Sequence, residues 1–140
     1  MLLDTNVLSE LMRPRPDAAV LDWFAAPAAQ VPMSISVITK AEILLGIALL
    51  PHGQKRAALA QAAQAMFDAD FKDRVLVFDT GTAEVYARIV AERSVMGRPM
   101  STEDAQIAAT ALQHRLPLVT RNTRDFEHVS GIQLINPWVS

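Results

Sequence analysis

Four segments of the chain place acidic or amide side chains directly after apolar stretches or near the start of amphipathic ones. They are LLDTN with Asp4, AEILLG with Glu42, STEDAQIA with Asp104, and LVTRNTRD with Asn122 and Asp125. Carboxylate and amide oxygens are the ligands that Mg²⁺ and Mn²⁺ prefer. Several carboxylates in one site would repel each other unless a cation compensated them. If the fold brings these segments together, the sequence predicts a divalent-cation site.

Each candidate also has a purely structural explanation. Asp4 could cap the helix predicted for TNVLSEL. Asp104 suits the positive N-terminus of the helix that follows Ser101. Asn122 and Asp125 are common turn residues that bond their own backbone. Taken singly, none of these residues decides between a structural and a catalytic role.

Glu42 is predicted to lie in an apolar helical stripe. Ile38, Leu45 and Leu49 stand four, three and seven residues away, so they share its helical face. An ionised carboxylate is costly to bury unless it is paired or coordinates a cation. Pairing with Lys40 is the structural alternative, and a functional role is the interpretation that we favour.

Short apolar segments alternate with longer amphipathic ones along the chain. The expected strands are residues 1–3, 31–35, 75–78, 116–120 and 132–135, and the expected helices are residues 5–12, 18–25, 37–50, 54–71, 82–96 and 102–114. This alternation predicts an α/β fold with a mostly parallel sheet flanked by helices on both faces. Each candidate follows a strand or lies near the start of the next helix, so a parallel sheet would bring all of them to one edge.

Composition limits the class of protein. The 140 residues fit a single domain over residues 1–140, and 51% of them are hydrophobic, which argues against disorder. No apolar run approaches the roughly 20 residues of a membrane span, and no basic-then-apolar leader opens the chain, so we expect a cytoplasmic protein with no membrane association. The absence of cysteine excludes disulfides and thiolate metal sites.

A formal net charge of −2 provides no overall attraction to nucleic acid. Local basic residues could still contact the phosphates of an RNA, and the candidates are Arg98, Arg121, Arg124 and Lys40. The three histidines, at positions 52, 114 and 128, show no clustering, which disfavours histidine-based ribonuclease chemistry.

Together, LLDTNVLSEL, SVITKAEILLGI, RPMSTEDAQIAATAL and LVTRNTRDF resemble, in order, the motifs of the PIN-domain family, and most closely its VapC and FitB type of bacterial toxin. The resemblance implies a single PIN-like domain with a five-stranded parallel sheet of order 3-2-1-4-5. It further implies a Mg²⁺- or Mn²⁺-dependent endoribonuclease, a homodimer and a cognate antitoxin protein whose tail blocks the acidic pocket.

The resemblance assigns the site residue by residue. It makes Asp4, Glu42 and Asp104 the metal-binding acids, with Thr5, Asn6 and Thr120 as polar support. The match departs at the fourth acid, where many relatives have Asp and this chain has Asn122, with Asp125 three residues later. We predict that Asn122 completes the catalytic set and faces the pocket, whereas Asp125 caps a turn or pairs with a neighbouring arginine.

One further Asp resembles the site acids, and two other functions are compatible with the sequence. Asp79 in VLVFDTG copies the appearance of LLDTN, but the implied strand order places it at the end of an edge strand, so we predict a helix cap. A phosphotransfer or phosphatase-like enzyme with an acidic pocket is an alternative function, although Asn6 stands where aspartyl phosphatases have a second Asp. A non-catalytic protein-binding domain is another, in which Trp23, Phe24 and Trp138 would contact a partner.

Overall fold

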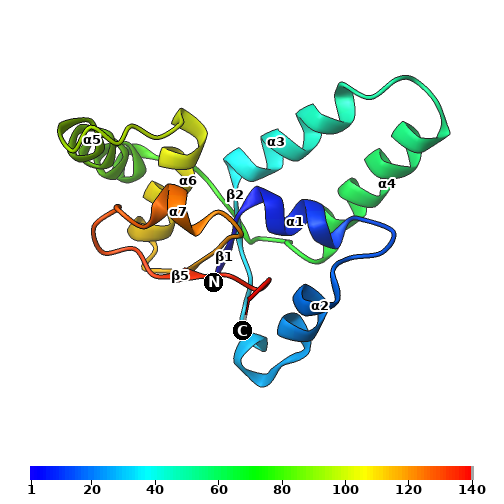
Figure 1. Ribbon diagram of the computed structural model, residues 1–140. Helices are drawn as coiled ribbons and strands as arrows, with labels where there is room; N and C mark the ends of the chain where they lie inside the picture. The colour runs from blue at the N-terminus through cyan, green and yellow to red at the C-terminus, as the bar shows by residue number, and fades with distance from the viewer. Residues whose placement is uncertain (140) are drawn as a thin grey trace.

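Short parallel strands in the centre of the molecule hold together the helices around them (Figure 1). The computed structural model describes residues 1–139. The strands are β1 (Leu2–Leu3), β2 (Ile35–Ser36), β3 (Val75–Leu76), β4 (Leu118–Val119) and β5 (Leu134–Ile135). They form a ladder of order β1-β4-β5 and a second ladder, β2-β3, and all three strand pairs are parallel. The predicted α/β class with parallel strands is confirmed.

The two ladders meet at β1. A parallel bridge pairs Leu2 with Ser34, and the backbone N–H of Leu3 donates to the Ser34 carbonyl at 2.9 Å. The predicted pairing of β3 with β2, and of β1 with β4 and β4 with β5, is therefore observed. The predicted contact of β2 with β1 is a single bridge at Ser34, the residue before β2. The expected strand over residues 31–35 is wrong in its position, because only Ile35 of that segment belongs to β2.

Helices follow every strand except the last. They are α1 (Thr5–Leu11), α2 (Ala18–Ala25), α3 (Val37–Ala48), α4 (Gln54–Ala69), α5 (Thr80–Val95), α6 (Thr102–Gln113) and α7 (Thr123–Phe126), with a 3₁₀ turn at Pro27–Ala29. Side-chain caps fix several of their starts: Asp4 caps α1, Ser36 caps α3 and Ser101 caps α6. In Figure 1, α3 and α4 form an antiparallel pair on one side of the strands, and α5 and α6 lie on the other.

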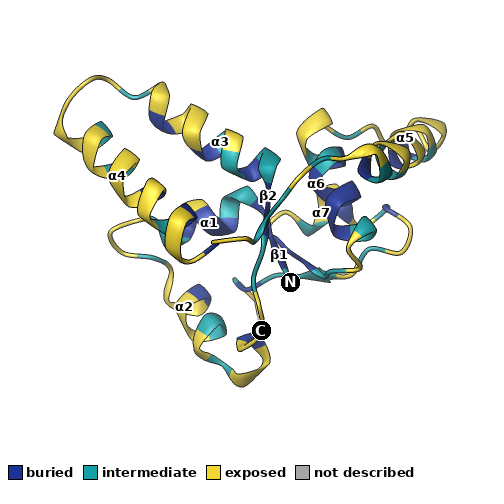
Figure 2. Ribbon diagram, turned by 180° about the vertical axis from the view of Figure 1, so that it is seen from behind, coloured by how far each residue is buried: buried dark blue, intermediate teal, exposed yellow. Residues whose placement is uncertain are grey.

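The core lies on both faces of the strands, as Figure 2 shows by the dark buried segments around β1 and β2. One cluster packs Leu2 and Leu118 against α6, and the other packs Leu3 and Val119 against α3 and α4. Successive strand residues thus point to opposite faces, as the period of two requires. Among residues 1–139, no helix is both long and apolar enough to cross a membrane.

Candidate active site

The carboxyl ends of the strands and the helices after them enclose an acidic pocket of about 490 Å³. Its lining includes all four predicted catalytic residues, which come from the end of β1, from α3, from α6 and from the turn after β4. The described lining residues are Asp4, Thr5, Asn6, Ser9, Glu10, Arg13, Glu42, Asp104 and Asn122. The parallel sheet therefore brings together segments separated by up to 118 residues, as the pattern predicted.

Asp4 is the most deeply placed acid of the pocket, with 5% of its surface exposed. Its Oδ1 accepts from the Thr5 backbone N–H at 2.8 Å, and its Oδ2 accepts from the Thr120 hydroxyl at 2.8 Å. Burial raises the pKa of Asp4 to about 6, and the charges of Asp104 and Glu42 add to this rise, while the two hydrogen bonds oppose it. Asp4 therefore carries an energetic cost when ionised, although it also caps α1.

Thr5 joins the first acid to the second. Its hydroxyl donates to Glu42 Oε1 at 2.6 Å and lies 3.0 Å from the Thr39 hydroxyl. Because Thr5 follows Asp4 directly, one chain segment fixes both carboxylates. Thr5 and Thr120 thus support the acids by specific hydrogen bonds, whereas Asn6 accepts from the Arg121 backbone N–H at 3.4 Å.

The expectation that Glu42 lies in a buried apolar stripe of α3 is wrong. The face of α3 that was expected to be buried is open, since Leu45 and Leu49 are 59% and 75% exposed. Ile43 and Ile47 supply the buried stripe instead. Glu42 is itself half-buried, at the boundary between the packed stripe and the pocket. Its position in the pocket therefore follows from its place in α3, which begins directly after β2, and not from an apolar environment on its own face.

Asp104 lies in the first turn of α6, where Ser101 caps the helix through the Asp104 backbone N–H at 3.1 Å. Partial burial raises the pKa of Asp104, the Ser101 hydroxyl opposes that rise, and the charges of Asp125, Glu42 and Glu103 reinforce it. The first turn of α6 thus brings this partly buried carboxylate close to other acids.

Of the two candidates for the fourth site residue, Asn122 lines the acidic pocket and Asp125 does not. Its backbone N–H donates to the Thr120 hydroxyl at 3.1 Å, so the turn after β4 is tied to the same hydroxyl that holds Asp4. Asp125 is exposed and lies on α7, in a shallow cavity of about 310 Å³ next to the acidic pocket. It is close enough to raise the pKa of Asp104 but does not line the acidic pocket.

The four predicted phosphate-binding residues lie outside the pocket lining. Arg121 stacks over the Trp138 ring at 5.1 Å, and Lys40 lies 5.3 Å from the centre of the Phe67 ring. Arg98 contacts the His128 ring at 2.8 Å. Arg124 lines the shallow cavity beside Asn122. Arg121 and Arg124 therefore border the site, whereas Lys40 packs against α4.

Sequence reasoning missed three lining residues of the pocket, Ser9 and the charged pair Glu10 and Arg13. Glu10 is 6% exposed, and both of its oxygens lie 3.1 Å from Arg13 Nη1. Glu10 Oε2 also accepts from the Asp17 backbone N–H at 3.0 Å. The signal was present in the spacing, because Asn6, Glu10 and Arg13 recur at intervals of four and three residues along α1 and the turn that follows it.

Asp79 is a helix cap, as predicted. Its carboxylate accepts from the Thr82 backbone N–H and hydroxyl at the start of α5, and the Thr82 hydroxyl in turn accepts from the Asp79 backbone N–H. The Gln113 amide donates to it as well, and these hydrogen bonds, that of Gln113 first, lower the pKa of Asp79 to about 2. Asp79 does not line the acidic pocket.

The oxygen donors of the pocket come from carboxylates, hydroxyls and the two amides of Asn6 and Asn122, which suits a hard divalent cation. Asp4, Glu42 and Asp104 lie close enough that the charges of Glu42 and Asp104 raise the pKa of Asp4. Within residues 1–139, however, no three side chains of Asp, Glu, His or Cys are arranged as a ready-made metal site. Among the described residues, the acids thus share a pocket without forming a preformed set of cation ligands.

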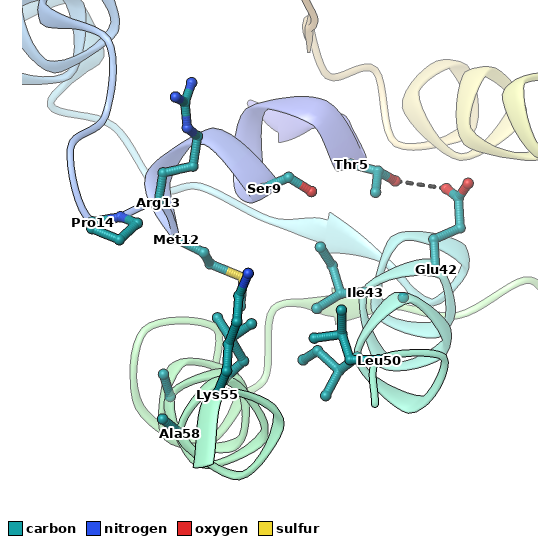
Figure 3. A pocket seen from close by; sticks show the side chains of 14 residues that line it. Thr5, Ser9, Met12, Arg13, Pro14, Glu42, Ile43, Leu50, Lys55 and Ala58 are labelled. Carbon is teal, nitrogen blue, oxygen red and sulfur yellow. Dashed lines mark hydrogen bonds between the residues drawn. The ribbon is translucent and has the colours of Figure 1, made fainter. Parts of the chain in front are cut away.

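A second cavity of about 660 Å³ opens from the acidic pocket and shares Thr5, Ser9, Arg13 and Glu42 with it. Figure 3 shows its walls: Met12 from α1, Ile43 and Leu50 from the α3 segment, and Lys55 and Ala58 from α4. The hydrogen bond between Thr5 and Glu42 marks the end of this groove nearest the acids.

Comparison with known proteins identifies the fold and its relatives. The family model of the PIN domain matches residues 1–132. This chain belongs to the PIN domain family. The resemblance inferred from the four motifs is therefore confirmed, and the domain corresponds to nearly the whole chain.

Curated relatives cover almost all of this PIN domain. It is 41% identical over 138 residues to the plasmid stability protein StbB of Pseudomonas syringae pv. tomato, covering 99% of this chain and 98% of that one. It is 37% identical over 138 residues to the VapC ribonuclease Y4jK of Sinorhizobium fredii, covering 99% and 97%.

Solved structures agree with the sequence comparison. The crystal structure of FitAcB from Neisseria gonorrhoeae matches this PIN domain with a TM-score of 0.89 and 37% identity, covering 99% of each chain. A toxin-antitoxin complex from Klebsiella pneumoniae matches with a TM-score of 0.70 and 29% identity, covering 97% of this chain and 96% of that one. The VapC and FitB type of PIN domain is thus the group to which this chain is most usefully compared.

Proposed function

We propose that this PIN domain is a divalent-metal-dependent endoribonuclease that acts as the toxin of a toxin-antitoxin pair. One observation carries the proposal: the parallel sheet brings Asp4, Glu42, Asp104 and Asn122 to one pocket of about 490 Å³. Membership of the PIN domain family and similarity to a VapC ribonuclease supply the reaction class.

Asp4, Glu42 and Asp104 would hold Mg²⁺ or Mn²⁺, with the Asn122 amide oxygen as a neutral neighbour. When bound, such an ion supplies a Lewis acid for the scissile phosphate and lowers the pKa of a coordinated water. The protein part of this task is to orient oxygens. Thr120 and the Thr5 backbone each occupy one lone pair of Asp4, which leaves its other lone pairs for a ligand. The Thr5 hydroxyl likewise fixes one oxygen of Glu42.

The test is RNA cleavage by the purified chain in Mg²⁺, in Mn²⁺ and in EDTA. Asp4→Asn, Glu42→Gln and Asp104→Asn should each lose nearly all metal-dependent cleavage, because each removes a charged oxygen ligand while preserving side-chain size. Asp79→Asn is the matched control, since it alters a strand-following Asp outside the pocket. Full cleavage by a folded core-acid variant would remove that residue from the site, and cleavage by the wild type in EDTA would contradict metal dependence.

A cognate antitoxin and a homodimer complete the proposal. The K. pneumoniae structure is a toxin-antitoxin complex, and the pocket of this chain presents acids to which a basic side chain of a partner could bind. Isolation of a protein that co-purifies with the chain, followed by RNA-cleavage assays with and without that protein, tests the antitoxin. Sedimentation of the isolated chain tests the dimer.

A further inference from the structure

Arg13 stands out in the acidic pocket, because it is the cation among the described residues that line it. Asp4, Glu10, Glu42 and Asp104 provide the acids of the same lining. An RNA strand carries a negative charge at each phosphate, so a pocket of acids repels the backbone on both sides of the reacting phosphate. A guanidinium at the rim of such a pocket is placed where it could offset that repulsion.

Glu10 holds one nitrogen of the Arg13 guanidinium, and most of the side chain is exposed to solvent. Its Nη1 donates to both oxygens of the buried Glu10 at 3.1 Å, yet the side chain is 63% exposed. A guanidinium has five N–H donors, and within residues 1–139 its hydrogen bonds run from Nη1 alone. In Figure 3 the Arg13 guanidinium points away from Met12 and Lys55, which lie in the apolar groove. The other donors are therefore free to meet a ligand outside that groove.

Glu10 is arranged to hold Arg13 in place. Its Oε2 also accepts from the Asp17 backbone N–H at 3.0 Å, which fixes the carboxylate between α1 and the start of α2. Pro14 and Pro16 flank the turn that follows Arg13, which limits the backbone freedom of this segment. A fixed carboxylate that orients an exposed arginine reduces the side-chain entropy that the arginine loses when it binds a phosphate.

We propose that Arg13, positioned by Glu10, binds a backbone phosphate of the RNA substrate next to the scissile one. The proposal deepens the proposed ribonuclease function and rests on it. It assigns substrate contact to a residue of the turn that follows α1, in addition to the arginines that follow β4. The competing explanation is that Arg13 serves only to neutralise the buried charge of Glu10.

The experiment measures binding of a fluorescein-labelled 20-nucleotide single-stranded RNA of mixed sequence. The assay uses the Asp104→Asn chain in EDTA so that the RNA is not cleaved. In this background, Arg13→Gln is compared with Arg15→Gln, because Arg15 is exposed and does not line the pocket. Arg13→Gln should weaken binding by about fivefold, and it should reduce the slope of log affinity against log salt by about 0.7, the value for one phosphate contact to a single strand. Arg15→Gln should change neither quantity. Equal affinity of the Arg13→Gln and Arg15→Gln chains would overturn the proposal.

Adding Glu10→Gln to Arg13→Gln separates phosphate binding by Arg13 from mere neutralisation of Glu10. If Arg13 only neutralises Glu10, the double variant Glu10→Gln/Arg13→Gln should bind RNA as the parent does, which would overturn the proposal. If Arg13 contacts phosphate, the double variant should bind as weakly as Arg13→Gln. In the chain with intact Asp104, Arg13→Gln should raise KM for cleavage with little change in kcat. Absence of metal-dependent cleavage in the wild type would instead refute the proposed function, so the two failures are distinguishable.

Discussion

Asp4→Asn should stabilise the metal-free chain above neutral pH, although it removes a residue of the active site. In the folded protein the pKa of Asp4 is raised from 3.8 to about 6, chiefly by burial. A shift of this size corresponds to about 3 kcal/mol of free energy of unfolding. The wild type binds this proton more tightly when folded than when unfolded. The stability that the proton contributes is complete below pH 3.8 and is lost as the pH rises through 6.

The asparagine should keep the hydrogen bonds of the site. Its Oδ1 can accept from the Thr5 backbone N–H, as Asp4 Oδ1 does. Its Nδ2 can donate to the Thr120 hydroxyl oxygen, which reverses the direction of the present hydrogen bond. The variant therefore loses the charge, but the hydroxyl hydrogen of the buried Thr120 loses its acceptor, so about 3 kcal/mol is the upper limit of the advantage.

Urea unfolding in EDTA, followed by circular dichroism from pH 4 to pH 8, measures the effect. We expect similar stability of the two chains near pH 4 and a growing advantage of Asp4→Asn up to pH 8, with equal m-values. Asp22→Asn, an exposed position of α2, is the control and should show no such trend. Adding Mn²⁺ at pH 7.5 should stabilise the wild type more than Asp4→Asn, since a ligand stabilises the state that binds it. A difference between Asp4→Asn and the wild type that stays constant with pH, or reverses, would refute this account of Asp4.

Three further changes test other parts of the structure. Asn122→Asp should tighten Mn²⁺ binding in calorimetric titrations, whereas Asp125→Asn should affect it less; a larger loss in Asp125→Asn than the gain in Asn122→Asp would contradict the placement of these residues. Asp79→Asn should retain RNA cleavage yet lower the thermal midpoint, because it removes the acceptor that caps α5. Arg93→Met should lower the free energy of unfolding by about 2–4 kcal/mol in urea titrations, since it leaves the carbonyls of residues 98 and 125 without their donor, and Arg88→Met on the exposed face of α5 is its control.

The alternation of apolar and amphipathic segments predicted the helices well, because caps and breakers are local features of the sequence. Ser36, Ser101 and Asp79 each begin a helix within two residues of its expected start. Strands were less predictable, since the observed ladders are only two residues long and depend on pairing partners far along the chain. The segment at residues 31–35 shows this: its apolar residues suggested a strand, but pairing with β3 begins only at Ile35.

The sequence predicted that Asp4, Glu42, Asp104 and Asn122 would meet in one pocket, and it missed the charged pair at the end of α1 and in the turn after it. Asp4 and Thr120 follow paired strands, so their meeting across the sheet is set by the register of β1 and β4. Glu10 lies on α1 and Arg13 follows two residues after the helix ends, both away from any strand end, and a Glu three residues before an Arg is equally typical of an exposed helix surface. Only the turn at Asp17, whose N–H binds Glu10, shows that this pair is fixed at the rim of the pocket.

The neutral residue at position 122 has an electrostatic consequence for the fold. Burial already raises the pKa values of Asp4 and Asp104, and neighbouring acids raise them further. A carboxylate at this position would add to that repulsion and lower the stability of the metal-free chain at neutral pH. Asn122 supplies an oxygen to the same lining without that cost, and in exchange it contributes no charge to cation binding. The Asn122→Asp variant should therefore gain Mn²⁺ affinity and lose metal-free stability together. A change in only one of the two, Mn²⁺ affinity or metal-free stability, would show that the side chain points away from the acids.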